Sequence, residues 1–167
     1  MFNVISLAKN KTMKKHFIIV SLWAISLLAF APPPSVDMSD DFKEGYFFYA
    51  PLTEETLRDA IAFAGVSSGE WVMAQALLES GSFKSNLCQN HNNLFGMKKP
   101  AVRRSTATGR TDNGFATYEC WYDAVKDMRL FQQYYRARGI DLNDYAYFLS
   151  ERYAEDVWYV YKLKKLM

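Results

Sequence analysis

The chain has 167 residues, 50% of them hydrophobic and 16% aromatic, so it can bury the core of one globular domain and is neither a repeat nor a disordered protein. Residues 1–31 hold four lysines and no acid. The rest of the chain therefore has 16 basic and 18 acidic residues, a net charge of −2. Nucleic-acid binding requires a strongly basic domain, so we expect no nucleic-acid partner.

Residues 1–31 have the pattern of a secretory signal peptide. Two lysines at 14–15 precede an uncharged apolar run over residues 17–30, and Ala29-Phe30-Ala31 gives a small-x-small cleavage site. The run is short for a membrane span, so we expect an exported protein of the periplasm or cell envelope. Proline at position 32 fits signal peptidase poorly, which leaves an uncleaved N-terminal membrane anchor as the alternative.

Residues 32–50 are predicted to be a linker or N-terminal extension, in which three prolines and a polar stretch to Gly45 form the linker and the aromatic residues Tyr46–Tyr49 pack on the domain. The folded domain is expected over 51–167. Its first helix is predicted over 54–64, with Thr53 as the N-cap.

A second helix is predicted to begin at a capping box in residues 67–70 and to end at Ser80-Gly81. From Trp71 onwards it is apolar on almost every side, and only Gln75 and Glu79 interrupt it. These two residues are four apart and share one stripe.

Glu79 would lie in the last turn, where burial and the negative end of the helix dipole both raise the pKa of a carboxyl group. A carboxylic acid that stays protonated near neutral pH can serve as a general acid. The alternative is that Gln75 and Glu79 mark the solvent-facing side of a core helix.

Between residues 81 and 118 the helical pattern stops, and asparagines and glycines predict turns and short strands. Asp112-Asn113-Gly114 is a strong hairpin signal. Helical spacing resumes at Trp121. The sequence therefore predicts an α+β domain, mainly α, with a small β lobe and a cleft between its lobes. The last three helices are expected at about 121–139, 144–152 and 156–166.

Two blocks, Ala74-Gln-Ala-Leu-Leu-Glu-Ser-Gly81 and Asn92-Asn-Leu-Phe-Gly-Met-Lys98, resemble the bacterial glucosaminidase family of endo-β-N-acetylglucosaminidases, which includes flagellar muralytic domains and autolysins. The stretches 115–125 and 153–159 resemble its later motifs. The resemblance implies a lysozyme-like fold over 51–167, no cofactor, and cleavage of the GlcNAc–MurNAc β-1,4 bond of peptidoglycan glycan strands. It also implies that Glu79 is the catalytic acid.

Four residues are candidates for substrate binding. Tyr153 resembles the family's cleft tyrosine, with packing between helices as the alternative. Asn93 would hold its loop against the cleft or serve only as a turn asparagine. The family usually continues Glu-Ser-Gly with Trp-Gly, where this chain has Ser82-Phe83, so either Phe83 supplies the lost aromatic surface or the cleft wall differs. Phe95 is either core beneath the loop or a stacking platform.

The second catalytic group is open. The family often places another acid in the β lobe, but residues 103–111 hold none, and Asp112 is the only candidate there. Its Asp-Asn-Gly context favours a turn residue, and Glu119 leads into a helix. A substrate-assisted route through the sugar's acetamido group would remove the need for a protein nucleophile.

Other polar residues give weaker signals. Cys88 and Cys120 form a candidate disulfide, or else remain two buried thiols. Arg103 and Arg104 are either a partner for the acidic stem peptide of peptidoglycan or a solvated charge pair. His91 has no neighbours at metal-ligand spacing, so no metal is expected.

Two alternatives to a glucosaminidase stay open. A muramidase or lytic transglycosylase would use the same fold on the same polymer. A non-catalytic wall-binding or scaffold domain is favoured by the missing second acid. In each case we expect a monomer.

Overall fold

The structure is a computed structural model that describes residues 40–167. The predicted signal peptide and the first part of the predicted linker lie outside the described residues. Within residues 40–167, no helix is both long enough and apolar enough to cross a membrane.

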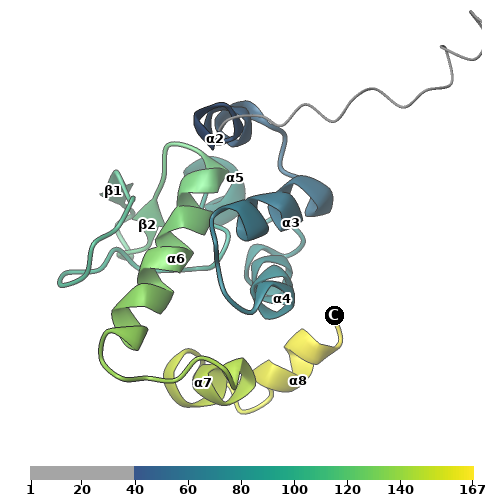
Figure 1. Cartoon of the computed structure of the whole chain (residues 1–167), viewed down its shortest axis with the longest axis vertical. Helices are drawn as coiled ribbons and strands as arrows, with labels where there is room; N and C mark the ends of the chain where they lie inside the picture. The colour runs from purple at the N-terminus through teal and green to yellow at the C-terminus, as the bar shows by residue number, and fades with distance from the viewer. Residues whose placement is uncertain (1–39) are drawn as a thin grey trace, which may run out of the picture. The chain divides into compact units, whose positions relative to one another are not determined.

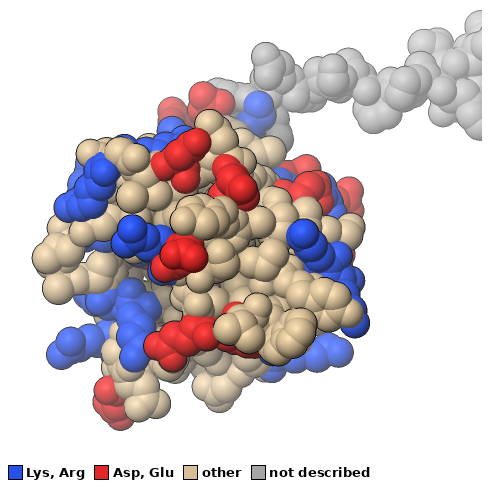
Figure 2. Space-filling model, turned by 90° about the horizontal axis from the view of Figure 1, so that it is seen from below, with Lys and Arg blue, Asp and Glu red and all other residues tan. Residues whose placement is uncertain are grey.

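The fold class is confirmed: the described chain is mainly helical and carries a small antiparallel sheet (Figure 1). Helix α6 passes between the β hairpin and helices α3 and α4, and α7 and α8 follow at one end of α6. On the face drawn in Figure 2, acidic and basic side chains are interspersed. The elements are α2 (Asp40–Tyr49), α3 (Glu54–Phe63), α4 (Gly69–Ser80), α5 (Asn86–His91), β1 (Gly109–Arg110), β2 (Ala116–Thr117), α6 (Trp121–Arg136), α7 (Tyr145–Arg152) and α8 (Tyr159–Lys164).

The linker prediction is wrong for residues 40–45, which begin helix α2 (Asp40–Tyr49), whereas the predicted packing of Tyr46–Tyr49 on the domain is correct for Phe47. Phe47 of this helix is buried, with its ring centroid 5.1 Å from that of Tyr122 and 6.2 Å from that of Trp121. The indole Nε1 of Trp121 also donates a hydrogen bond of 2.8 Å to the carbonyl of Ala50. The polar residues around Phe47 lie on the exposed side of α2, so the segment belongs to the folded domain.

Helix α4 begins without the predicted capping box. Ser68 has a left-handed backbone (φ 58°) and its side chain caps nothing. Instead, the Ser67 backbone N–H donates to Gln132 Oε1 at 2.8 Å, and Gln132 Nε2 donates back to the Ser67 carbonyl at 2.9 Å. A side chain of α6 therefore satisfies the Ser67 N–H, which the Glu70 side chain would satisfy in the predicted capping box. The predicted stop is correct, because Gly81 is a left-handed C-cap.

The β lobe contains the predicted hairpin and one helix that was not predicted. Gly109 pairs with Thr117 and Arg110 with Ala116, around the Asp112-Asn113-Gly114 turn. The short helix α5 lies before the hairpin, with the Ser85 side chain as its N-cap. Six residues are too few to show a helical period, and the asparagines of this segment favour turns.

Candidate active site

A cleft with a volume of about 320 Å³ opens where the end of α4 meets the 95–98 loop, α6 and the end of α7. This size lies at the lower end of the range for ligand sites. Glu79 is the only acid among the residues that line it. The lining residues are Glu79, Phe95, Gly96, Met97, Lys98, Arg103, Phe131, Arg152 and Tyr153.

Glu79 lies in the last turn of α4, as predicted, and its side chain is partly buried. Burial raises its pKa above the ordinary 4.5, and a hydrogen bond from Tyr159 lowers the pKa in part. Gln75, on the same stripe, is 0% exposed. The alternative that this stripe faces solvent is therefore wrong, and α4 turns its polar stripe into the protein.

A chain of hydrogen bonds fixes the Glu79 carboxyl group. Tyr145 donates its hydroxyl to Gln75 Oε1 at 3.1 Å, which directs the amide nitrogen of Gln75 to the hydroxyl of Tyr159 at 3.4 Å. Because Tyr159 accepts from Gln75, it can donate its own proton to Glu79 Oε1, at 2.7 Å. Gln75 and Glu79 of α4 are thus joined through a tyrosine of α8.

Tyr159 is a site residue that sequence reasoning missed. It stands in the stretch 153–159, which resembles a family motif, but only Tyr153 was assigned a role there. The signal that could have found it is that motif, in which Tyr159 follows Tyr153-Ala-Glu-Asp156.

Replacing Tyr159 by phenylalanine should raise the pKa of Glu79 further, because the hydroxyl group favours the ionised carboxylate. A general acid works in its protonated form, so the descending limb of the pH profile of kcat/KM should move to higher pH. We also expect a roughly tenfold lower kcat from the lost hydrogen bond. Tyr161→Phe, on the exposed side of α8, should leave the profile unchanged. A limb that stays in place or moves to lower pH would contradict this role.

The 93–97 loop is held by the buried Asn93, as one prediction had it. Its Nδ2 donates to the carbonyls of Met97 and Ala116, both at 2.8 Å, and its Oδ1 accepts from the backbone N–H groups of Phe95 and Met97. All polar atoms of the amide are used inside the protein. Asn93 therefore supports the loop that lines the cleft. Its amide has no free polar group with which to contact a substrate.

Gly96 brings this loop against the catalytic candidate. Its φ is +64°, and a Cβ added there would lie 3.3 Å from Glu79 Oε2. A side chain would strain the backbone and also crowd the carboxyl group. The Asn-Leu-Phe-Gly block is thus explained by its contact with Glu79.

Gly96→Ala should cost about 1–2 kcal/mol of stability from the left-handed backbone, and should also lower activity by displacing the carboxyl group. Gly114→Ala is the matched control, because its φ is +82° and nothing lies within 4 Å of the added Cβ. Thermal melts and rates on the same substrate would compare the two variants. Equal losses of activity in both would show that crowding at Glu79 has no part in the effect.

Tyr153 lines the cleft, and its hydroxyl donates a 2.7 Å hydrogen bond to the carbonyl of Phe95. The proton of Tyr153 is therefore committed to the loop, and only its oxygen lone pairs can meet a substrate. Phe95 is 1% exposed. Its ring belongs to the core, which confirms the prediction of core beneath the loop, and the alternative of a stacking platform is wrong.

Two further candidates lie outside the cleft. Phe83 is not among the lining residues: it packs partly buried against the core, and its backbone N–H donates to Ser80 Oγ at 2.9 Å. Asp112 is exposed in the hairpin turn and does not line the cleft either. The turn interpretation of Asp112 agrees with this position.

Arg103 forms a buried ion pair, contrary to the prediction of a solvated charge. Its guanidinium group contacts both carboxylate oxygens of Asp127, at 2.7 and 3.0 Å, and the two side chains are 8% and 0% exposed. Tyr118 adds a hydrogen bond of 2.8 Å to the same carboxylate. This network attaches one wall of the cleft to α6. Arg104 is exposed and lies outside the cleft.

The described residues include both cysteines and His91. Cys88 and Cys120 are buried free thiols, so the candidate disulfide is absent and the alternative of two separate thiols holds in the structure. Burial raises the pKa of both thiols, which makes them poor nucleophiles. Residues 40–167 contain no cluster of His, Cys, Asp or Glu that could hold a metal ion, and His91 lies at the end of α5.

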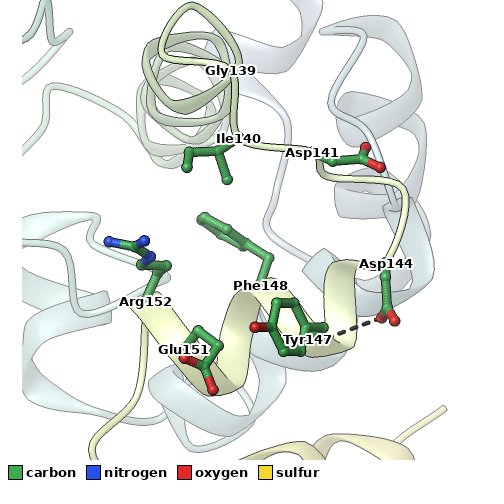
Figure 3. Close-up of a pocket in the computed structure, with 8 residues that line it drawn as sticks. All are labelled: Gly139, Ile140, Asp141, Asp144, Tyr147, Phe148, Glu151 and Arg152. Atoms are coloured by element: carbon green, nitrogen blue, oxygen red, sulfur yellow. Dashed lines mark hydrogen bonds between the residues drawn. The ribbon is translucent and has the colours of Figure 1, made fainter.

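A second hollow of about 280 Å³ lies beside α7 (Figure 3). Two of its three acids have structural roles: Asp144 Oδ1 accepts from the Tyr147 backbone at 3.0 Å, and Asp141 Oδ1 accepts from the Asn143 backbone at 2.8 Å. The Glu79 cleft is therefore the candidate active site.

A partly buried carboxylic acid, fixed by hydrogen bonds in an open cleft, is an arrangement for general-acid catalysis, the chemistry of glycoside hydrolases. Residues 55–167 match the Glucosaminidase family, described as mannosyl-glycoprotein endo-β-N-acetylglucosaminidase, and the chain belongs to this family. The family makes it a glycoside hydrolase by class and supports action on peptidoglycan.

Among solved structures, the chain is similar to the catalytic domain of the autolysin Auto from Listeria monocytogenes. The two share 21% identity with a TM-score of 0.45, over 99% of this chain and 94% of the autolysin domain. No curated protein gives a match.

Proposed function

We propose that this protein is an exported peptidoglycan hydrolase that cleaves the β-1,4 bond between GlcNAc and MurNAc, with Glu79 as the general acid. The observation that carries the proposal is the position of Glu79: it is the one acid of the cleft, burial raises its pKa, and Tyr159 holds it in place. Family membership supports the class of reaction. The predicted signal peptide supports action in the periplasm or cell envelope.

In the proposed reaction, Glu79 donates its proton to the glycosidic oxygen as the bond from that oxygen to the anomeric carbon breaks. Positive charge then develops on the sugar ring. Because no other acid lines the cleft, the nucleophile is either water or the carbonyl oxygen of the sugar's own acetamido group. In the second case a cyclic oxazolinium ion forms, and water opens it while the Glu79 carboxylate takes up a proton from that water. The enzyme then returns to its starting state.

Tyr153 fits the substrate-assisted route as a hydrogen-bond acceptor. Its own proton goes to Phe95, so its oxygen is available to the acetamido N–H of the sugar. That contact would turn the acetamido carbonyl oxygen towards the anomeric carbon. Tyr153 therefore stays a proposed substrate-binding residue, and its proposed role is to accept a hydrogen bond from the substrate.

If no carboxylate of the β lobe is needed, Asp112→Asn should keep activity within about twofold of wild type, as is usual for a surface change. Rates of release of soluble glycan from sacculi would measure this, and Glu79→Gln gives the reference for an inactive enzyme. A folded Asp112→Asn variant as inactive as Glu79→Gln would make Asp112 the second acid.

Identification of the new reducing ends tests the bond specificity. Digestion of purified sacculi, followed by borohydride reduction and mass spectrometry, should give reduced GlcNAc at the new ends. Reduced MurNAc would identify a muramidase, and an anhydro sugar a lytic transglycosylase. Binding to sacculi with no new ends would favour the wall-binding domain.

A further inference from the structure

The Glu79 cleft contains two basic side chains that no acid neutralises. Lys98 and Arg152 both line it, both are exposed, and neither forms an ion pair within residues 40–167. Arg103, the third cation of the lining, is already paired with Asp127. Residues 32–167 carry a net charge of −2. Two cations without an ion-pair partner therefore give this small cleft a charge opposite in sign to that of the domain.

Both cations are held at the edges of the cleft. Lys98 pairs with Phe115 through an antiparallel bridge, and its Nζ lies 5.4 Å from the centroid of the Phe115 ring. Arg152 is the last residue of α7, and Figure 3 shows its guanidinium group at the opposite end of the second hollow from Asp141 and Asp144. Glu151 is the acid drawn nearest to it in Figure 3, and within residues 40–167 Arg152 forms no ion pair with any acid of that hollow.

The two cations do not serve Glu79. The shift in its pKa has two causes, burial and the hydrogen bond from Tyr159, and neither cation is among them. Lys98 and Arg152 are therefore placed to meet negative charge that arrives with a ligand.

We infer that Lys98 and Arg152 bind a carboxylate of the glycan strand and so make the enzyme specific for acidic, MurNAc-containing substrate. This inference rests on the proposed function. The carboxylate has two possible sources with the same chemistry: the stem peptide, or the lactyl group of a MurNAc that has lost its peptide. Neutral polymers of GlcNAc carry neither group and would lose this contact.

The test uses three substrates with the same sugar backbone. The first is soluble glycan that still bears its peptides. The second is glycan stripped by an amidase, so that only the lactyl carboxylates remain. The third is either of these strands after carbodiimide coupling to methylamine, which turns the carboxylates into neutral amides. The variant is Lys98→Gln/Arg152→Gln. The matched control, Lys99→Gln/Arg104→Gln, removes the same charge from exposed positions outside the cleft.

The cleft variant should show a roughly tenfold higher KM than wild type on the acidic substrates, with kcat changed little, because charge-assisted hydrogen bonds are lost. It should equal wild type on the neutral amides, and the control variant should behave as wild type throughout. Added salt should raise the KM of wild type and leave that of the cleft variant nearly constant. A preference kept on stripped strands assigns the carboxylate to the lactyl group, and a preference lost there assigns it to the stem peptide.

The inference is overturned if wild type does not distinguish acidic from neutral strands, or if the control variant loses as much as the cleft variant. Binding is measured in parallel, with each charge variant in the Glu79→Gln background and the same strands in calorimetry. A wild type that binds these strands but cuts none of them contradicts the proposed function, and the binding constants still decide whether Lys98 and Arg152 recognise the carboxylate.

Discussion

Glu79→Gln should lower kcat on sacculi by about 10²–10⁴-fold, the usual effect of losing a general acid. The amide is nearly the same size as the carboxyl group, and its oxygen can still accept the hydrogen bond from Tyr159. What it cannot do is donate the proton to the leaving oxygen. Glycan release followed over time would measure the loss, and a variant that clears sacculi at the wild-type rate would remove Glu79 from the mechanism.

The same variant should be more stable than wild type at neutral pH. Because burial raises the pKa of Glu79 above 4.5, the neutral acid stabilises the fold below that pH, and this stabilisation is lost as the pH rises through the higher folded-state pKa. Glutamine is neutral at every pH and avoids the loss. The Tm of Glu79→Gln should therefore exceed that of wild type at pH 8, and the two should converge at pH 4. Such a gain would also show that the inactive variant is folded.

Asp127→Ala should destabilise the protein by about 3–5 kcal/mol, because it leaves the buried Arg103 guanidinium group without its partner. That loss corresponds to a fall in Tm of roughly 10–20 °C for a domain of this size. The change should also loosen the cleft wall that Arg103 forms. Differential scanning calorimetry would measure the shift.

An exposed ion pair of the same chain gives the control. Arg58 and Glu70 are 2.9 Å apart with side chains 53% and 65% exposed, so Glu70→Ala should cost at most about 1 kcal/mol. The double variant Arg103→Met/Asp127→Leu should recover part of the stability lost in Asp127→Ala, since it removes both buried charges. If Asp127→Ala melts together with Glu70→Ala, the buried network has no special role.

The sequence predicted those features that depend on neighbouring residues. Glu79 could be located because the helical spacing and the Ser80-Gly81 stop lie within one segment, and the structure ends α4 there. The hairpin turn was predictable for the same reason, since Asp112-Asn113-Gly114 favours that conformation by itself.

The missed features depend on residues far apart in the chain. Tyr159 reaches Glu79 across 80 positions, and Gln132 replaces the predicted N-cap of α4 from 65 positions away. Arg103 could not be recognised as buried, because its partner Asp127 lies on another element and a charged residue in a loop is normally solvated. Local patterns carry no information on which distant side chain will satisfy a buried polar group.

The central claim is that burial raises the pKa of Glu79 and that the proton of this carboxyl group is used in catalysis. The most direct measurement is a carbon-13 NMR titration of the side-chain carboxyl groups of glutamate, with the Glu79 signal assigned by its absence in Glu79→Gln. We expect a pKa above 4.5 that coincides with the descending limb of the pH profile of kcat/KM, since that limb reports on the free enzyme. A Glu79 signal that titrates at or below 4.5, or a limb that follows a different group, would contradict the account.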